Sequence, residues 1–249
     1  MFSRRDLIKL LAPLIVEQIL SVLVGMVDVV MVSSVGEAAV SGVSLVDSIS
    51  ILIIQILSAL ATGGAVISAQ YLGKKQPGNA CRAAGQLLTV TTALSLLVTV
   101  VAIVGNRTIL GAIFGKVEQA VMEDAVIYLV ITSISYPFLA VYNSCAALFR
   151  AMGNSKISMY TSLVMNSINI IGNAVCVFGL HMGVAGVAYP TLISRMVAAV
   201  LMLYLIQQSG NEIRIRRLGE LKPNLLMIKN ILSIGIPNGL ESGMFQFGK

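Results

Sequence analysis

Acidic side chains stand inside the first apolar stretch of this chain, where an ionisable group is costly. Wound as a helix of about 100° per residue, Glu17, Ser21 and Asp28 fall at about 0°, 40° and 20°, which makes one narrow polar stripe. A charge near the centre of a spanning helix costs about 2.5 to 3.5 kcal/mol and typically marks an ion or proton path. We therefore expect the stripe to face protein or water. Asp28 is its leading functional candidate, whereas Glu17 is equally consistent with helix packing.

A second polar stripe, rich in amides, lies in the fifth apolar stretch. At helical spacing one face carries Ser162, Asn166, Asn169 and Asn173. Such amides can simply hold helices together, at about 0.6 kcal/mol per hydrogen bond. Amide carbonyls beside a facing carboxylate also suit a hard cation or a proton relay. If the two stripes face each other, they form a polar cavity within the six-helix unit that would suit H+ or Na+.

Other polar residues in apolar stretches admit two interpretations each. Asp47 stands near the predicted end of the second stretch, where it is either functional or merely solvated. Tyr136 and Asn143 share a face on either side of Pro137, a predicted kink, and packing is favoured for both. Arg195, in the sixth stretch, is expected to reach the cytoplasmic interface. The pair Gly63-Gly64 predicts a close helix contact.

The elements that position these residues are predicted to be membrane-spanning helices. The chain is 57% hydrophobic and 11% charged, with a mean hydropathy of +0.90, whereas soluble domains carry about a quarter charged residues. Stretches at or above the roughly 20 residues that cross a bilayer as helix are 7–32, 43–71, 83–104, 125–149, 157–179 and 183–206. We predict an all-α polytopic membrane protein: a six-helix lobe in 1–206, a cytoplasmic connector in 207–230 and the start of a seventh helix in 231–249.

The basic residues indicate an orientation and not a nucleic-acid partner. The net charge is +6. With a cytoplasmic N-terminus, the outside loops hold only Arg107 and Lys116, and the inside segments hold Arg4, Arg5, Lys9, Lys74, Lys75, Arg82, Arg150, Lys156, Arg214, Arg216, Arg217, Lys222 and Lys229. This positive-inside bias predicts that the N-terminus and the connector lie in the cytoplasm.

Motifs of enzymes and of nucleotide-driven pumps are absent from the sequence. His181 is the single histidine, and neither HExxH, Gly-x-Ser-x-Gly nor a Walker motif occurs. Cys81, Cys145 and Cys176 have no metal-binding spacing and are expected to be small packing residues. We therefore expect no enzyme and no cofactor. An ion gradient remains as the energy source, because a buried carboxylate can sense it.

The chain contains a weak repeat. Pro13 and Glu17 recur at the same spacing as Pro237 and Glu241. An even number of predicted spans separates the two copies, so both run in the same direction, which predicts a parallel repeat of one lobe and the start of a second. Such a unit is expected to transport little alone and to need a missing C-terminal lobe or a second copy.

Several motifs resemble those of multidrug and toxic compound extrusion (MATE) transporters. The first helix of that family is similar to Pro13–Gln18 followed by Gly25–Gly36. Further matches in the same order are Gln70–Lys75, Phe149–Lys156 and Gly183–Thr191, so that the resemblance covers essentially the whole chain. It implies a bacterial plasma-membrane (inner-membrane) antiporter of two six-helix lobes. Such proteins export drugs and other organic cations in exchange for protons or sodium.

The resemblance also implies a cation site in the first lobe. The first-helix aspartate of the family falls on Asp28, the fifth-helix asparagine on Asn169 and the sixth-helix threonine on Thr191. Some members have an aspartate where this chain has Asn173, and the lost charge puts sodium binding in doubt while leaving proton coupling through Asp28. Supporting roles are expected for Glu17, Ser21, Asn166, Tyr136, Asn143 and Glu241.

Three alternatives remain. One is a lipid-linked precursor flippase of related fold, which a basic central cavity would favour. Another is a half-size transporter that acts as a dimer, since MATE members usually have roughly twice as many residues. The third, an intramembrane enzyme, is disfavoured by the missing catalytic constellations.

Overall fold

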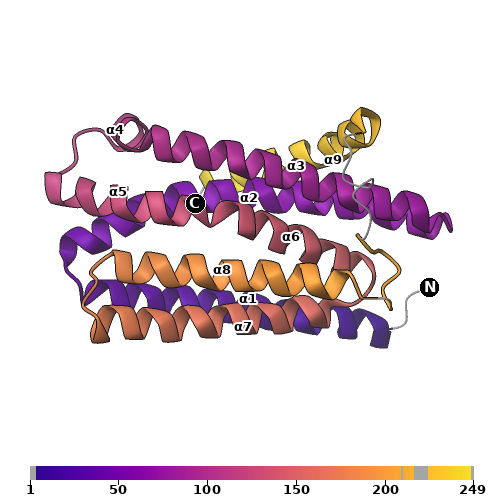
Figure 1. Ribbon diagram of the computed structural model, residues 1–249, viewed down its shortest axis with the longest axis horizontal. Helices are drawn as coiled ribbons and strands as arrows, with labels where there is room; N and C mark the ends of the chain where they lie inside the picture. Colours follow the sequence, from indigo (N-terminus) through magenta and orange to yellow (C-terminus); the bar gives the residue numbers. More distant parts are fainter. Residues whose placement is uncertain (1–3, 209, 216–223, 248–249) are drawn as a thin grey trace.

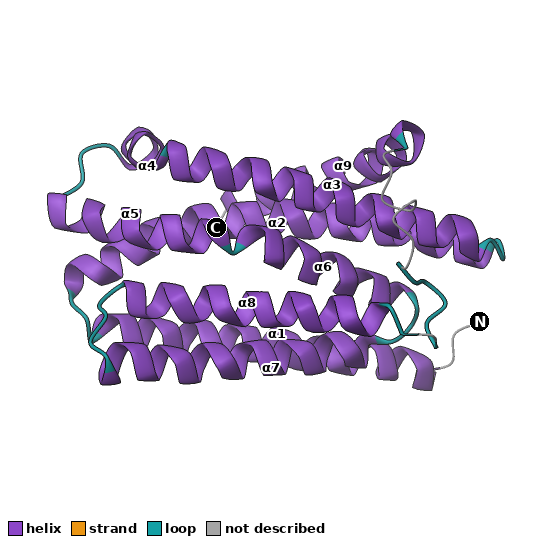
Figure 2. Cartoon of the chain, in the orientation of Figure 1, coloured by secondary structure: helices purple, strands orange, loops and turns teal. Residues whose placement is uncertain are grey.

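The protein is a bundle of long α-helices joined by short loops (Figure 1). The structure, a computed structural model, describes residues 4–208, 210–215 and 224–247. Helix predominates throughout this part of the chain, and no strand occurs in it (Figure 2). The predicted all-α architecture is confirmed. It is the arrangement expected where lipid offers no partner for backbone N–H and C=O groups.

The helices in chain order are α1 (Arg4–Ser33), α2 (Glu37–Gly73), α3 (Pro77–Val104), α4 (Asn106–Phe114), α5 (Gln119–Ile134), α6 (Tyr136–Ala151), α7 (Ser155–Ala174), the π-helix η1 (Val175–Gly179), α8 (Ala185–Ile206) and α9 (Leu225–Phe247). Within the described residues, five helices are long and apolar enough to cross a membrane, and the bent pair α5–α6 makes a sixth span. These six spans are the six that the sequence predicts.

Some element boundaries differ from the prediction. Helix α2 begins at Glu37 and not near residue 43, because its polar first turns fall below the hydropathy of the rest. The short helix α4 was not predicted, since nine residues are too few to span a bilayer. Helix α9 begins at Leu225, ahead of the predicted residue 231. Three basic residues used in predicting the orientation lie outside the described residues: Arg216, Arg217 and Lys222.

The helices pack in two layers (Figure 1). The first layer contains α1, α7 and α8, and the second contains α2, α3, α5 and α6, with α9 packed along the outside of α2. Helix α8 joins the layers, because it packs against α5 and α6 as well as against α7. Helix α1 packs mainly on α7 and touches α2 only slightly. Helix α8 is therefore the main link between the two layers.

Close approach between helices depends on glycine at particular points. A Cβ on Gly63 would lie 2.8 Å from the backbone nitrogen of Gly235 in α9, and one on Gly64 would lie 2.5 Å from Cδ1 of Leu87 in α3. The predicted role of Gly63-Gly64 in helix contact is confirmed. In the first layer, a Cβ on Gly172 would lie 2.7 Å from Cβ of Pro190, so that α7 and α8 meet closely.

Helices α5 and α6 form one span that is broken at Ser135 and bent by 46°. Pro137 stands in the first turn of α6, where it has no backbone N–H to continue the preceding turn. Ser135 donates a hydrogen bond of 2.6 Å to the carbonyl of Thr132, one of the groups near the break. The predicted kink is confirmed, and it lies near the middle of the span.

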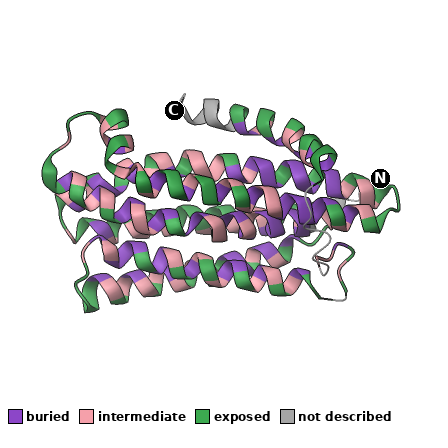
Figure 3. Ribbon diagram, turned by 45° about the horizontal axis from the view of Figure 1, so that its top comes forward, coloured by how far each residue is buried: buried purple, intermediate pink, exposed green. Residues whose placement is uncertain are grey.

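Exposed residues line the outward sides of the helices (Figure 3), and many of them are large and apolar. Val30 on α1, Val104 on α3 and Tyr204 on α8 are each at least 66% exposed. Side chains of this kind suit a lipid environment and not water. The chain is therefore a multi-pass membrane protein.

Basic residues gather at one end of the bundle. The loops that follow α2 and α6 lie at the same end as the start of α1 (Figure 1), and Lys74, Lys75 and Arg150 stand in or beside them. Helix α4, which contains Arg107, and the following loop with Lys116 lie at the opposite end. The assignment of the basic end to the cytoplasm stays a prediction.

Candidate functional site

A polar cluster forms where α1, α7 and α8 meet. Asn173 on α7 donates from Nδ2 to Asp28 Oδ1 on α1, at 2.7 Å. The same amide lies 3.4 Å from Asn169 Oδ1, one turn earlier on α7. The structure thus brings the leading carboxylate of the first stripe against the amides of the second. We call Asp28, Asn169, Asn173 and Thr191 the Asp28 cluster.

The cluster continues from α7 to α8 through Thr191. Asn169 donates from Nδ2 to Thr191 Oγ1 at 3.0 Å, and Thr191 donates in turn to the carbonyl of Val187 at 2.9 Å. Asn173 is fully buried and Asn169 is 6% exposed, while Asp28 is half-buried. All four residues assigned to the cation site by sequence therefore lie in one connected network within the first layer.

Local backbone features hold the two helices of this network in place. The contact of Gly172 with Pro190 lies beside Asn173 and Thr191 and sets the short distance between α7 and α8. The π-helix η1 begins at Val175, directly after the cluster. Single π-turns in α-helices occur often at functional sites.

A second carboxylate of α1 has partners of its own. Tyr142 of α6 donates to Glu17 Oε1 and Ser158 of α7 donates to Glu17 Oε2, each at 3.1 Å. Glu17 therefore lies in the same contact between α1 and α7 as Asp28, several turns nearer the start of both helices. Ser21, between them in sequence, is exposed and stands outside both groups.

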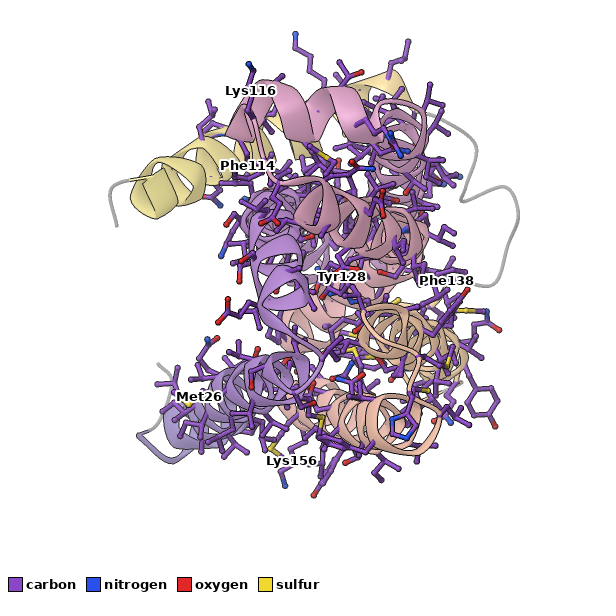
Figure 4. All side chains as sticks on the ribbon, turned by 90° about the vertical axis from the view of Figure 1, so that its left-hand side faces the viewer. Met26, Phe114, Lys116, Tyr128, Phe138 and Lys156 are labelled. Carbon is purple, nitrogen blue, oxygen red and sulfur yellow. The ribbon has the colours of Figure 1, made fainter. Side chains whose placement is uncertain are left out.

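A separate polar cluster forms at the break between α5 and α6. Arg195 of α8 donates from Nη1 to Ser135 Oγ at 2.7 Å. Tyr128 of α5 donates to Asp47 Oδ1 of α2 at 3.2 Å. The charges of Arg195 and Asp47 lie near each other without a direct ion pair. Figure 4, a view along the helices, shows Tyr128 near the centre of the bundle, where it is 6% exposed.

Two predictions from the sequence are wrong here. Arg195 does not reach the membrane interface, because its side chain turns inward to the broken span, where Ser135 offers an acceptor. Asp47 is not near the end of its helix: α2 begins at Glu37, so Asp47 stands about 15 Å along the helix axis. We call Asp47, Tyr128, Ser135 and Arg195 the Arg195 cluster.

The remaining candidates lie apart from Asp28. Asn166 is 3.4 Å from Ser162 Oγ within α7. Tyr136, fully buried, shares a hydrogen bond of 3.0 Å with Ser50 of α2. The Nδ2 atom of Asn143 is buried and has no hydrogen-bond partner. Glu241 is exposed on α9. No group of three or more His, Cys, Asp or Glu residues that could hold a metal ion occurs in the described part of the chain.

Comparison with protein families identifies this architecture. The MatE family model matches residues 13–175, a segment that begins at Pro13 and includes Asp28, Asn169 and Asn173. The chain belongs to the MatE family. The solved structure described as the outward-facing conformation of a multidrug resistance MATE family transporter has the same fold: the TM-score is 0.87 at 21% identity, over 95% of this chain and 52% of that one.

Two curated relatives are similar along nearly the whole MatE-family chain. The uncharacterized transporter YisQ of Bacillus subtilis is 30% identical over 95% of this chain and 52% of its own length. The probable multidrug resistance protein NorM of Thermotoga maritima is 29% identical over 98% of this chain and 53% of its own length. The MatE-family chain thus spans about half the length of the curated relatives it matches.

Sequence reasoning missed several polar partners in this MatE-family lobe. Tyr128, Tyr142 and Ser158 were not singled out, although all three bond a carboxylate. A signal was present for the two tyrosines, because a tyrosine inside a span must find a partner for its hydroxyl when it is buried. Ser158 carried no such signal, since serine is common between membrane helices.

Proposed function

We propose that this chain is one lobe of a cation-coupled antiporter that exports drugs or other organic cations, with the proton as the coupling ion. The observation that carries the proposal is the hydrogen bond between Asp28 and Asn173. In this bond the half-buried carboxylate of Asp28 has a neutral partner. Asp28 can therefore gain or lose a proton without breaking an ion pair. An ionisable residue inside a membrane bundle is a typical proton carrier.

Proton binding at Asp28 alters the contact between α1 and α7. The ionised carboxylate accepts the amide of Asn173 in a charge-assisted hydrogen bond, which is about twice as strong as a neutral one. A protonated carboxyl is a weaker acceptor and carries an O–H donor of its own. The buried Oδ1 of Asn173 has no hydrogen-bond partner, and rotation of the amide would turn this oxygen toward the new donor. The position of the proton is thereby coupled to the packing of two helices.

The hydrogen bonds of the amide side chains favour a proton over sodium as the coupling ion. Sodium is a hard cation and requires several oxygen ligands. In the Asp28 cluster, Asp28 Oδ1 and Asn169 Oδ1 both already face the Nδ2 group of Asn173. Thr191 Oγ1 accepts from Asn169. Sodium binding at Asp28 and Asn169 would require these hydrogen bonds to be exchanged, whereas a proton requires one carboxylate.

The charges of the interior support a cationic cargo over a lipid-linked phosphate. Among the described residues of the two clusters, the carboxylates Asp28 and Asp47 face one guanidinium, that of Arg195. A flippase for anionic headgroups would need a basic cavity instead. The relative named as a probable multidrug resistance protein supports drugs as the substrate class. A second lobe, or a second copy of this chain, completes the transporter.

The test is ion-driven efflux of ethidium from membrane vesicles. The chain is fused in frame to the remaining half of its relative YisQ, and a pH gradient or a sodium gradient is imposed. We expect the pH gradient to drive efflux and Asp28→Asn to reduce it to the level of empty vesicles. The chain without a second lobe should give little efflux, since alternating access needs two opposing units.

The matched control is Glu37→Gln, which makes the same chemical change at an exposed carboxylate in the first turn of α2. It should leave efflux unchanged. Full efflux by Asp28→Asn would contradict the proposal. Efflux driven by sodium alone would assign the coupling to sodium and reject the proton.

A further inference from the structure

Helix α1 has few buried contacts with the rest of the bundle. It packs mainly on α7 and touches α2 only slightly. Along residues 11–33, the part of α1 whose side chains the structure describes, only Pro13 and Val32 are buried. Such a helix gains little from core packing, so its hydrogen bonds to other helices decide how firmly it is placed.

Two carboxylates of α1 make those hydrogen bonds. Asp28 accepts from Asn173 of α7. Glu17 accepts at Oε1 from the Tyr142 hydroxyl of α6 and at Oε2 from the Ser158 hydroxyl of α7, each at 3.1 Å. Among the described side chains of α1, these two acidic groups are the ones that bond to another helix.

The hydrogen bonds of Glu17 tie α1 to both layers. Tyr142 belongs to α6 in the second layer and Ser158 to α7 in the first, and both donors are buried. The Ser158 hydroxyl also lies 3.0 Å from the carbonyl of Ser155, so that its single hydrogen is divided between two acceptors. We therefore expect Tyr142 to contribute more than Ser158 to the placement of α1.

The tie at Glu17 and the contact at Asp28 lie at two levels of one helix face. Glu17 precedes Asp28 by eleven residues, which is about 16 Å along α1 and about 20° around it. Their partners follow in the same order along α7, Ser158 before Asn173. A single hydrogen bond leaves a helix free to turn and tilt about it, whereas two at different levels remove that freedom.

We propose that Glu17 is a positioning residue of the coupling site, because its two hydrogen bonds hold α1 in the register at which Asp28 meets Asn173. A movement of α1 that breaks the tie at Glu17 also displaces Asp28 from its amide partner. The role in coupling rests on the proposed function of Asp28, whereas the placement of α1 does not.

An amide can replace the carboxylate in this role. In Glu17→Gln, Oε1 still accepts from Tyr142, and the new Nε2 group can donate to Ser158 Oγ. The hydrogen of Ser158 then goes to the carbonyl of Ser155, which is already within reach. A positioning role therefore survives Glu17→Gln, whereas a role as ion carrier does not.

The first measurement does not depend on transport. In the full chain with its native cysteines replaced by alanine, nitroxide labels are attached through Met26→Cys and Ile171→Cys. Both positions are exposed, and each lies two residues before a member of the contact between Asp28 and Asn173. Electron paramagnetic resonance in lipid bilayers should give one narrow distance distribution for the parent and for Glu17→Gln. Glu17→Ala should broaden it.

Two further variants separate this tie from a general loss of structure. Gln18→Ala, the matched control, removes a side chain of the same length at an exposed neighbouring position and should leave the distribution unchanged. Tyr142→Phe removes one donor but keeps the buried ring, and should broaden the distribution less than Glu17→Ala does. It also serves where Glu17→Ala folds poorly. The proposal is overturned if Glu17→Ala and Tyr142→Phe both leave the distribution narrow, or if Gln18→Ala broadens it equally.

The second measurement is proton-driven efflux of ethidium by the chain fused to the remaining half of YisQ. Glu17→Ala should lower the rate per folded transporter about tenfold, the size of two hydrogen bonds between membrane helices. Glu17→Gln should stay within about twofold of the parent. Loss of efflux in Glu17→Gln as complete as in Asp28→Asn would mean that Glu17 carries an ion itself, and the positioning role would be rejected.

The two proposals fail separately. Full efflux by Asp28→Asn would reject the proposed function, while the distances between the labels would still show whether Glu17 places α1. Conversely, an unchanged distance distribution in Glu17→Ala would reject the positioning role even where Asp28→Asn abolishes efflux.

Discussion

The Asp28 and Arg195 clusters place the same chemical group in opposite surroundings. Asp28 and Asp47 are both half-buried aspartates on the first two helices of the chain. Asp28 accepts a hydrogen bond from a neutral amide, whereas Asp47 has a tyrosine hydroxyl and the field of a guanidinium. A carboxylate among neutral donors changes its charge at modest cost. Asp47 lies instead in a cluster that also contains the positive charge of Arg195, so the loss of its own charge would leave that guanidinium without compensation.

Position in the fold reinforces this contrast. The Asp28 cluster lies within the first layer, where α1 is held mainly by α7. The Arg195 cluster crosses between the layers at the broken span. Asp28 thus lies on a helix that packs mainly against a single neighbour, whereas the Arg195 cluster lies where the two layers meet.

The largest expected effect is on stability and separates the two aspartates directly. Asp47→Asn should destabilise the protein by about 3 kcal/mol, because it removes a negative charge near Arg195 and leaves the guanidinium without compensation inside the bundle. Asp28→Asn, which changes one polar group for another of the same shape, should cost about 1 kcal/mol or less. Chemical unfolding in detergent measures both variants, and equal losses would show that the two sites are electrostatically alike.

A smaller effect comes from adding a charge to the neutral cluster. Asn173→Asp places a second carboxylate beside Asp28, and like charges at this distance should destabilise the protein by about 1 to 2 kcal/mol in the absence of a cation. Sodium should restore the loss by binding between them, whereas choline should not. The melting temperature in each salt tests this.

The control for that substitution is Asn166→Asp on the same helix, two turns from Asn173 and bonded to Ser162. It adds the same charge away from Asp28 and should show no selective recovery in sodium. A selective response by Asn166→Asp would mean that sodium acts on the helix in general and not on the cluster.

The Asp28 cluster could be predicted from the sequence because its residues on α7 follow one another at helical spacing. Asn169 and Asn173 are one turn apart on α7, and apolar residues surround both, so that a helical projection places them on one face. Their juxtaposition with Asp28 was conditional on two stripes facing each other, and the packing of α1 on α7 satisfies that condition.

The Arg195 cluster could not be predicted in the same way. Its members come from α2, α5, the break at Ser135 and α8, and no periodicity in one helix relates them. An arginine a few turns from the end of a span reaches the interface when its helix faces lipid. Arg195 instead faces a bend of 46°, and that bend is a tertiary feature of the neighbouring span. The inward direction of the Arg195 side chain thus depends on where α8 packs.

The smallest expected effect concerns the neutral end of the Asp28 cluster. Thr191→Val removes the acceptor for Asn169 Nδ2 and should cost about 0.6 kcal/mol, the average for a hydrogen bond between membrane helices. Thr191→Ser keeps the hydroxyl and should recover most of that loss. Since neither change touches Asp28, proton-driven efflux should fall only a few-fold in Thr191→Val. A loss as complete as that of Asp28→Asn would mean that Thr191 binds the coupling ion itself, and the contrast between a proton-carrying carboxylate and its neutral support would no longer hold.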